Sequence, residues 1–219
     1  MNLRKFNKDV VELLASIIAI LKLCINNLFL RDHFLVFRSF INAKYYNYAS
    51  KTCRIGKRTS ISSPVTCIKG NVSIGSNSHL GRYAVLTTWR TKENVGRIVM
   101  GDGVRVGDYC HFSSANEIIV EDGVLMGRFV SIVDNSHGVF NKNELSLPPS
   151  KRPIVSKGKV RICKNVWIGD KVTICPNVTI GESTIIGANS VVTKDVPPFS
   201  VAAGNPCSVI KVINNEYGA

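Results

Sequence analysis

An aliphatic residue returns every six positions through the second half of this chain, and that period limits what the chain can fold into. The unbroken run is Ile162, Ile168, Ile174, Ile180, Ile186 and Val192. Neither the 3.6-residue period of a helix nor the alternation of an ordinary strand produces a period of six. The following residue is small or polar, and it is glycine at Gly169, Gly181 and Gly187. We interpret this neighbour as the place of a sharp turn, because glycine tolerates unusual backbone angles.

The same phase appears upstream, with a few slips and insertions. Its apolar positions are Ile55, Ile61, Ile68, Ile74, Leu80, Leu86, Met100, Val106, Phe112, Val120, Met126 and Ile132. Three short flat sides of this kind close a triangular coil of about 18 residues, and stacked coils bury a ladder of inward side chains. The sequence therefore predicts an all-β fold, a parallel β-helix of hexapeptide repeats with an N-terminal α-helical cap. The period itself does not fix the hand of the coil.

The first fifty residues differ from the rest of the chain, so we predict two parts, residues 1–50 and 51–219. The segment Val10–Leu30 is apolar, but charges interrupt it, and its longest uncharged stretch is nine residues. Crossing a bilayer takes about 20 apolar residues. Two alternatives remain for this predicted helix. Either it packs on the rest of the protein, or it lies on a membrane surface with the help of Arg4, Lys5, Lys8 and Lys22.

The net charge is distributed unevenly along the chain. Lysine and arginine number 28 against 15 acidic residues, a net charge of +13, and residues 1–60 alone carry 11 basic and 3 acidic side chains, or +8. A basic surface attracts nucleic acid, anionic lipid, acidic glycans or phosphorylated cofactors. Nucleic acid is the least favoured partner, because no recognition module is present. The seven cysteines form no CxxC pair and favour a reducing, cytoplasmic location, with peripheral contact at the inner membrane face as an addition.

The largest break in the repeat covers Gly138–Lys159, a 22-residue segment that fits no hexad. Long excursions from a compact fold are usually functional loops. Of the four histidines, only His137 abuts this loop. Imidazole titrates nearest to neutral pH, so we predict His137 as the general base of an acyl transfer. Asp134 is the local candidate to fix the tautomer of that ring. A corner aspartate that bonds its own turn is the equally weighted alternative.

The segment Trp167–Lys211 reads WIGDKVTICPNVTIGESTIIGANSVVTKDVPPFSVAAGNPCSVIK. It resembles the C-terminal signature of hexapeptide-repeat acyltransferases, most of all the maltose, galactoside and polysaccharide O-acetyltransferases, and the resemblance extends over residues 55–212. It implies a left-handed parallel β-helix and a homotrimer with active sites between adjacent subunits. It also implies acetyl-CoA as the donor, no metal requirement, and a histidine in the position of His137 as the base.

Further site residues are carried over from this resemblance. Ser113 falls where galactoside-type relatives have an asparagine that helps to bind the acceptor or the reacting thioester. Ser113 could donate one hydrogen bond there, with Ser114 or a backbone amide as alternatives. Trp167 is expected either to form a wall of the thioester site or to pack under the loop. The CoA-binding positions implied by the resemblance are Asp170, Ala188, Thr193, Lys194 and Lys211, with the lysines facing the nucleotide phosphates or only solvent.

The leading functional hypothesis is an acetyl-CoA-dependent O-acetyltransferase that acts on a sugar hydroxyl of a bacterial surface polysaccharide (capsule or O-antigen) or its precursor. The alternative is N-acetylation of a nucleotide-linked amino sugar, although no separate nucleotide-binding unit precedes the coils. A metal-dependent hydratase on the same scaffold is disfavoured, because it needs a closely spaced histidine pair. A non-catalytic binding module remains, and it predicts that loss of His137 is harmless. Six cations between Lys151 and Lys164 would attract CoA phosphates or an acidic glycan, or would only be solvated.

Overall fold

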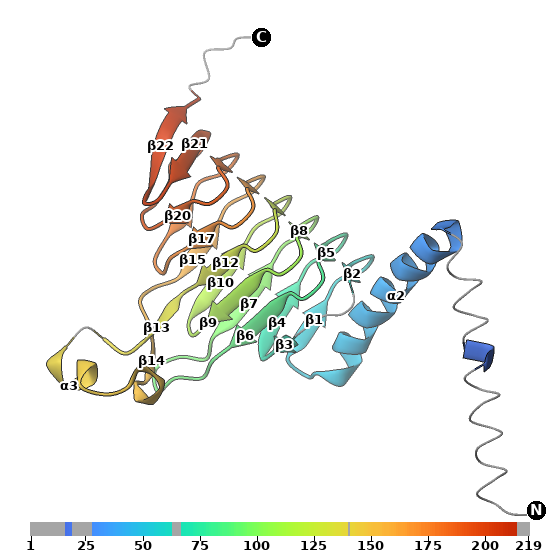
Figure 1. The fold of residues 1–219 in the computed structure, drawn as a ribbon, viewed down its shortest axis with the longest axis horizontal. Coiled ribbons are helices and arrows are strands. Elements are labelled where there is room, and N and C mark those ends of the chain that lie inside the picture. The colour runs from blue at the N-terminus through green and yellow to red at the C-terminus, as the bar shows by residue number, and fades with distance from the viewer. Residues whose placement is uncertain (1–15, 19–27, 63–66, 140, 214–219) are drawn as a thin grey trace, which may run out of the picture.

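The predicted architecture is present: the chain forms a left-handed parallel β-helix with three sides. The computed structural model describes residues 16–18, 28–62, 67–139 and 141–213. Figure 1 shows the coils stacked in chain order, from β1 beside the long helix to β20 near the C-terminal hairpin. Each side of the coil is one sheet, and every neighbouring pair of coil strands is parallel.

The first sheet has the order β1 (Cys53–Ile55), β4 (Asn71–Ile74), β7 (Arg97–Met100), β10 (Glu117–Val120), β15 (Val160–Ile162) and β18 (Thr179–Ile180). The second has β2 (Ser60–Ile61), β5 (His79–Leu80), β8 (Arg105–Val106), β11 (Leu125–Met126), β16 (Trp167–Ile168), β19 (Ile185–Ile186), β21 (Ser200–Gly204) and β22 (Cys207–Val212). The third has β3 (Cys67–Lys69), β6 (Val85–Thr88), β9 (His111–Ser114), β12 (Ser131–Val133), β17 (Thr173–Ile174) and β20 (Val191–Val192). Strands β21 and β22 are antiparallel and close the C-terminal end.

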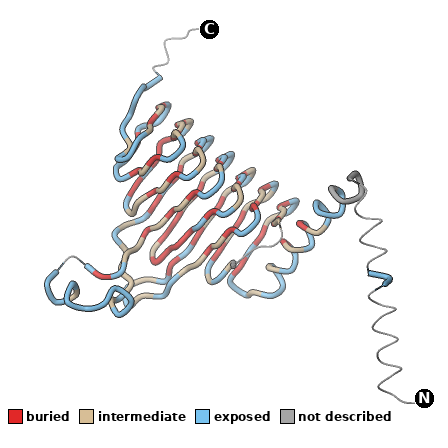
Figure 2. The backbone as a smooth tube through the Cα atoms, in the orientation of Figure 1, coloured by how far each residue is buried: buried red, intermediate tan, exposed pale blue. Residues whose placement is uncertain are grey.

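The core is the predicted ladder of hexad positions. Met126, Ile168 and Ile186 lie in register on three successive coils and are almost completely buried. Figure 2 shows the buried residues along the inner side of every coil, with the exposed ones at the corners. Removing these apolar side chains from water stabilises the stack by roughly 25 cal/mol per Å² of area.

The glycines that follow the ladder positions serve a purpose other than the predicted one. None of Gly169, Gly181 and Gly187 has a positive φ. A Cβ on Gly169 would lie 2.6 Å from the backbone nitrogen of Ala188, so glycine is needed for close stacking of coils. The left-handed corner angles are instead adopted three residues into each hexad, by residues such as Asn165, with a φ of 58°. Asparagine tolerates that region better than most residues do.

Helix α2 (Leu28–Ala49) covers the N-terminal end of the coil (Figure 1). Asn47 holds it there, because its Nδ2 donates to Ile55 O at 2.8 Å and its Oδ1 accepts from Ile55 N at 2.6 Å. Asn42 Nδ2 likewise donates to Ile61 O at 3.0 Å. These bonds satisfy the edge of the first coil, which would otherwise present unpaired backbone groups. Most of the apolar segment 10–30 lies outside the described residues.

Two insertions leave the coil at the corner between the third and first sheets. The short insertion, residues 89–96, follows β6 and is closed by the bridge between Arg90 and Val95. The long loop, residues 138–159, lies two coils further along, after β12. It contains α3 (Lys142–Leu145) and a 3-10 turn, η1 (Pro149–Lys151), and projects from the side of the stack (Figure 1). At its base β13 (Asn135–His137) pairs antiparallel with β14 (Ile154–Ser156).

No helix among the described residues is both long enough and apolar enough to cross a bilayer.

Candidate active site

The two insertions meet over one residue of the intervening coil, Ser113 on β9. Trp89, the first residue of the short insertion, donates from Nε1 to Ser113 Oγ at 3.0 Å. Asn135, at the start of β13, donates from Nδ2 to Ser113 Oγ at 3.1 Å and to Ser113 O at 2.7 Å. These two side chains leave Ser113 only 8% exposed. The predicted site residue Ser113 is therefore the point where both insertions are joined.

His137 lies beside this junction. Successive side chains on a strand point to opposite faces, so His137 projects to the same side of β13 as Asn135, which reaches Ser113. The ring of His137 is exposed, and no hydrogen bond joins it to another described residue. Its register partner across the hairpin is Ile154. The geometry therefore presents a solvent-accessible imidazole close to a buried serine hydroxyl, on a rigid hairpin.

Asp134 has a different environment from the one predicted for a residue that orients His137. Its carboxylate is completely buried. Oδ1 accepts hydrogen bonds from Ala115 N at 2.6 Å and Asn135 Nδ2 at 3.2 Å. Oδ2 accepts from Ser114 Oγ at 2.7 Å and Asn116 N at 2.9 Å. Asp134 thus holds the turn of the preceding coil and not the imidazole, since no bond joins it to His137 among the described residues.

A cavity of about 600 Å³ opens between the two insertions. Its walls are Trp89, Arg90, Thr91, Lys92 and Glu93 on one side and Pro153, Ile154, Val155 and Ser156 on the other. Neither His137 nor Ser113 is among these wall residues, but each neighbours one of them, since Ile154 is the register partner of His137 and Trp89 donates to Ser113. The volume is in the range typical of small-molecule sites. Its mixture of aromatic, aliphatic and charged side chains suits a polar molecule with apolar faces.

The predicted CoA-binding residues do not gather at this cavity. Thr193 and Lys194 are exposed and follow β20, at the same corner of the coil as the long loop. Asp170 and Ala188 lie instead at the corner between the second and third sheets, and Lys211 lies on β22. Asp170 accepts from Arg128 N at 2.8 Å, and this backbone hydrogen bond is the main reason that its pKa is lowered. Within one chain, the predicted CoA-binding residues therefore lie at two different edges of the coil.

Trp167 was expected at the wall of the thioester site or under the long loop. The structure places it on the outer face of the second sheet, between Leu125 and Ile185 in register, and 52% exposed. It does not pack under the loop. Two stacked ring pairs line the neighbouring corner, formed by Tyr83 with Tyr109 and by Tyr109 with Phe129, at centroid distances of 4.7 and 4.9 Å.

The basic residues in and after the long loop are largely neutralised by acidic neighbours. Lys159 Nζ lies 2.7 Å from Glu117 Oε2, and Arg97 pairs with the same buried carboxylate. Burial opposes ionisation of Glu117, but these two cations outweigh it and lower its pKa. Arg161 pairs with Glu121, and Lys164 lies 3.9 Å from Asp122. Of the other three cations of this set, Arg152 donates to the backbone oxygens of Leu147 and Leu145, and the exposed Lys151 and Lys157 fit the predicted attraction of anions directly.

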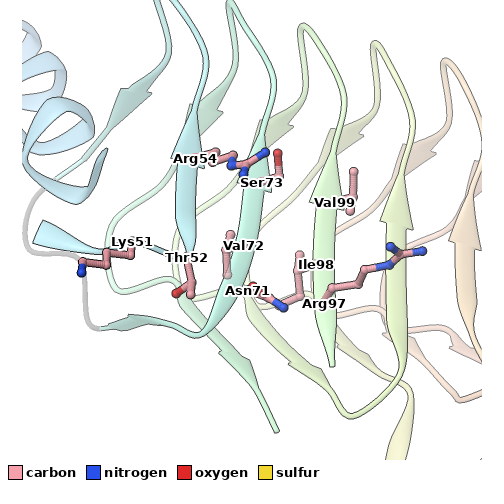
Figure 3. Close-up of a pocket in the computed structure, with 9 residues that line it drawn as sticks. All are labelled: Lys51, Thr52, Arg54, Asn71, Val72, Ser73, Arg97, Ile98 and Val99. Carbon is pink, nitrogen blue, oxygen red and sulfur yellow. The ribbon is translucent and has the colours of Figure 1, made fainter. Parts of the chain in front are cut away.

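Part of the N-terminal basic excess lies on the first sheet. Figure 3 shows a shallow groove of about 280 Å³ across β1, β4 and β7, with Arg54 above Thr52 and with Lys51 at one end. Arg97, at the other end, is already paired with Glu117. The groove contains no histidine and no cysteine. It offers cations and hydroxyls without a group suited to proton transfer at neutral pH.

A family model described as bacterial transferase hexapeptide (six repeats) matches residues 159–194. Together with the three-sided parallel coil, this match shows that the chain has the hexapeptide repeat and the fold of such transferases. The chain is 36% identical over 125 residues to "Putative lipopolysaccharide biosynthesis O-acetyl transferase WbbJ" of Escherichia coli K12, covering 55% of this chain and 63% of that protein. It is 35% identical over 146 residues to the galactoside O-acetyltransferase of the same organism, covering 66% of this chain and 58% of the relative. The chain thus spans less than two thirds of these relatives.

The fold has a counterpart among solved structures. AntD, an N-acyltransferase from Bacillus cereus in complex with dTDP and 3-hydroxybutyryl-CoA, superimposes with a TM-score of 0.63 at 21% identity. The match covers 79% of this chain and 89% of that one. At this identity the similarity establishes a shared fold only.

Proposed function

We propose that this protein transfers an acetyl group from acetyl-CoA to a hydroxyl of a sugar, in a bacterial surface polysaccharide or its precursor. The observation that carries the proposal is the exposed imidazole of His137 beside a 600 Å³ cavity and next to the buried hydroxyl of Ser113. The named relatives include a lipopolysaccharide and a galactoside O-acetyltransferase, which supports the choice of a sugar acceptor.

The reaction follows from the placement of these groups. A sugar bound between the two insertions would present a hydroxyl to His137, whose neutral ring accepts the proton as the oxygen attacks the thioester carbonyl. The new C–O bond forms while the carbonyl oxygen becomes negative. The C–S bond then breaks, and the histidine returns its proton to the departing thiolate. No covalent acyl-enzyme is required, so donor and acceptor would be bound together.

Assembly of several copies is part of the proposal. The CoA-binding residues implied by the resemblance lie at two edges of a single chain, so one donor molecule can meet all of them only if a second copy supplies one edge. Exposed apolar groups on the second sheet and its corner would be covered by such an assembly, among them Trp167, Leu125 and the stacked rings of Tyr83, Tyr109 and Phe129. A homotrimer with sites between subunits is the form that we propose.

We also propose a cytoplasmic location with peripheral contact at the inner membrane face. Helix α2 supports this part, because Phe34, Phe37 and Ile41 are exposed on it and Lys44 lies nearby. Aromatic and aliphatic side chains beside cations favour an anionic lipid surface. Removal of residues 1–45 should abolish sedimentation with anionic vesicles, and unchanged sedimentation would contradict this part of the proposal.

The second candidate is N-acylation of a nucleotide-linked amino sugar, and the fold similarity to AntD is the observation that favours it. An amino group that is already neutral attacks without a general base, so this reaction depends less on His137 than attack by a hydroxyl does. Matched acceptors that differ only in carrying a hydroxyl or an amino group would separate the two candidates.

The central test is His137→Gln, assayed by CoA release from acetyl-CoA with a panel of methyl glycosides. We expect kcat/KM to fall about 10²- to 10⁴-fold, the range for loss of a general base. The thermal unfolding midpoint should change little, because the ring is exposed and makes no described hydrogen bond. His111→Gln is the matched control, since His111 is also exposed but lies at the start of β9, away from the corner where the two insertions leave the coil. Equal rates for both variants would overturn the proposed role of His137.

A further inference from the structure

The groups around Ser113 limit the direction in which its hydroxyl hydrogen can point. An indole N–H can only donate, so Trp89 must use one lone pair of Ser113 Oγ. The orientation of the Asn135 amide is equally defined. Its nitrogen faces Ser113 O at 2.7 Å and Asp134 Oδ1 at 3.2 Å, both of which can only accept. The amide has only two hydrogens for these two acceptors and for Ser113 Oγ, which lies 3.1 Å from Nδ2, and its nitrogen cannot accept a hydrogen from the serine.

Both groups that face Ser113 Oγ are therefore donors, and neither can accept the hydrogen of its hydroxyl. No described residue accepts that hydrogen in a hydrogen bond with Ser113 Oγ. A hydroxyl carries one donor hydrogen and two acceptor sites, so the missing partner must be an acceptor. Ser113 is 8% exposed, which leaves a narrow opening through which a bound molecule can supply that acceptor.

We propose that Trp89 and Asn135 are positioning residues that turn the hydrogen of the Ser113 hydroxyl toward the oxyanion of the transition state. This inference rests on the proposed function. Donors fixed in advance, in a site that excludes water, stabilise developing negative charge without reorganising. Here the two insertions supply the fixing groups, one from each side, and Asp134 holds Asn135 in turn.

The same geometry does not favour Ser113 as an acyl-accepting nucleophile. A nucleophilic oxygen needs a base that takes its proton, and no described residue accepts a hydrogen from Ser113 Oγ. Trp89 has a second part in the site, because it is also a wall of the 600 Å³ cavity. Trp89→Phe keeps most of that wall and removes only the N–H, so it isolates the positioning role.

The test combines kinetics with an observation of the indole proton. CoA release from acetyl-CoA is measured with methyl glycosides of glucose, galactose and N-acetylglucosamine as acceptor probes. Ser113→Ala should lower kcat about 10²- to 10³-fold, as loss of an oxyanion donor does, with little change in KM for acetyl-CoA. Trp89→Phe should lower kcat about tenfold, and should have no further effect in the Ser113→Ala background. Tyr48→Phe, an exposed aromatic substitution on α2, should match the wild type.

The indole measurement gives an answer without turnover. The Trp89 N–H signal, assigned by its loss in Trp89→Phe, should move and exchange faster with solvent in Ser113→Ala. An unchanged signal would contradict the hydrogen bond and overturn the inference. Wild-type kcat in Ser113→Ala, with His137→Gln inactive, would overturn the donor role while leaving the proposed function intact. Additive effects of Trp89→Phe and Ser113→Ala would show that Trp89 acts elsewhere. Full activity of His137→Gln would instead count against the proposed function.

Discussion

Replacing Asp134 with alanine tests how the site is built, because the carboxylate is fully buried and four donors converge on it. Two of the donors have other acceptors. Ser114 Oγ also reaches Arg97 O at 3.0 Å, and Asn135 Nδ2 also reaches Ser113 O. The backbone N–H groups of Ala115 and Asn116 have no such substitute on the same turn. Leaving a buried donor unpaired costs about 1–3 kcal/mol, so the variant should lose about 2–6 kcal/mol of unfolding free energy.

A loss of that size is a large part of the roughly 5–15 kcal/mol that stabilises a typical domain. Urea unfolding followed by circular dichroism would measure it, on wild type and variant at the same protein concentration. Asp134→Asn should cost less, about 1–3 kcal/mol, because its amide nitrogen faces only one backbone donor. Asp102→Ala is the matched control. Asp102 accepts from Ser76 N at 2.6 Å in the same kind of corner but is exposed, so its loss should cost at most about 1 kcal/mol.

The two possible roles of Asp134 predict opposite results for unfolding and for the pH–rate profile. If Asp134 oriented the His137 ring, Asp134→Asn would leave unfolding nearly unchanged and would displace the acidic limb of the pH–rate profile. If Asp134 holds the turn at residues 114–116, the unfolding free energy falls and that limb stays where it is. Asp134→Ala within 1 kcal/mol of the wild type, together with a displaced limb, would refute the assignment made from these hydrogen bonds.

Three further outcomes are expected. Phe112→Ala should destabilise by about 3–5 kcal/mol in urea unfolding, because the ring is completely buried, whereas Phe37→Ala on an exposed ring should stay within about 0.5 kcal/mol. Burial lowers the pKa of His79 below its usual 6.5, so the unfolded chain binds the proton more readily than the folded chain, and the unfolding free energy should fall as pH drops through 6.5. His79→Gln should reduce that fall. An equally steep loss of unfolding free energy between pH 7.5 and 5.5 in the variant would contradict this prediction. Lys194→Ala should raise KM for acetyl-CoA about three- to tenfold without changing kcat, less so in high salt, while Lys142→Ala on α3 should not.

The hexad period predicted the coil and most of its interior. Residues such as Ile162 and Ile174 are buried as expected, because the first position of each hexad points inward on every coil. The fifth position, as in Val166 and Val172, is buried as well. The same period misassigned the glycines. It marks where small residues recur, but it cannot distinguish a turn that needs a positive φ from a contact that has no room for a Cβ, and Gly169 is the second kind.

The site was predicted less completely, because its contacts cross from one coil to the next. The roles of Ser113 and His137 stay predictions. The sequence suggests a partner for Asp134 three residues away, whereas three of its four donors lie 18 to 20 residues earlier in the chain. The sequence analysis assigns no role to Trp89 or Asn135. Trp89 lies in an interruption of the repeat, where no hexad position is defined, and the contact of Asn135 with Ser113 is made to the preceding coil.

The register between neighbouring coils is the feature that would have located Trp89 and Asn135. Thr87, Ser113 and Val133 are register partners on β6, β9 and β12. Trp89 and Asn135 each lie two residues after the register partner of Ser113, just past the ends of β6 and β12, and both side chains reach Ser113 Oγ from the coils on either side. Neighbouring strands lie about 4.8 Å apart, which brings both side chains within reach of one hydroxyl. The site is therefore set by the count of residues between corners, and a one-residue deletion between Leu86 and Trp89 would turn the indole away from Ser113 without touching the inward ladder.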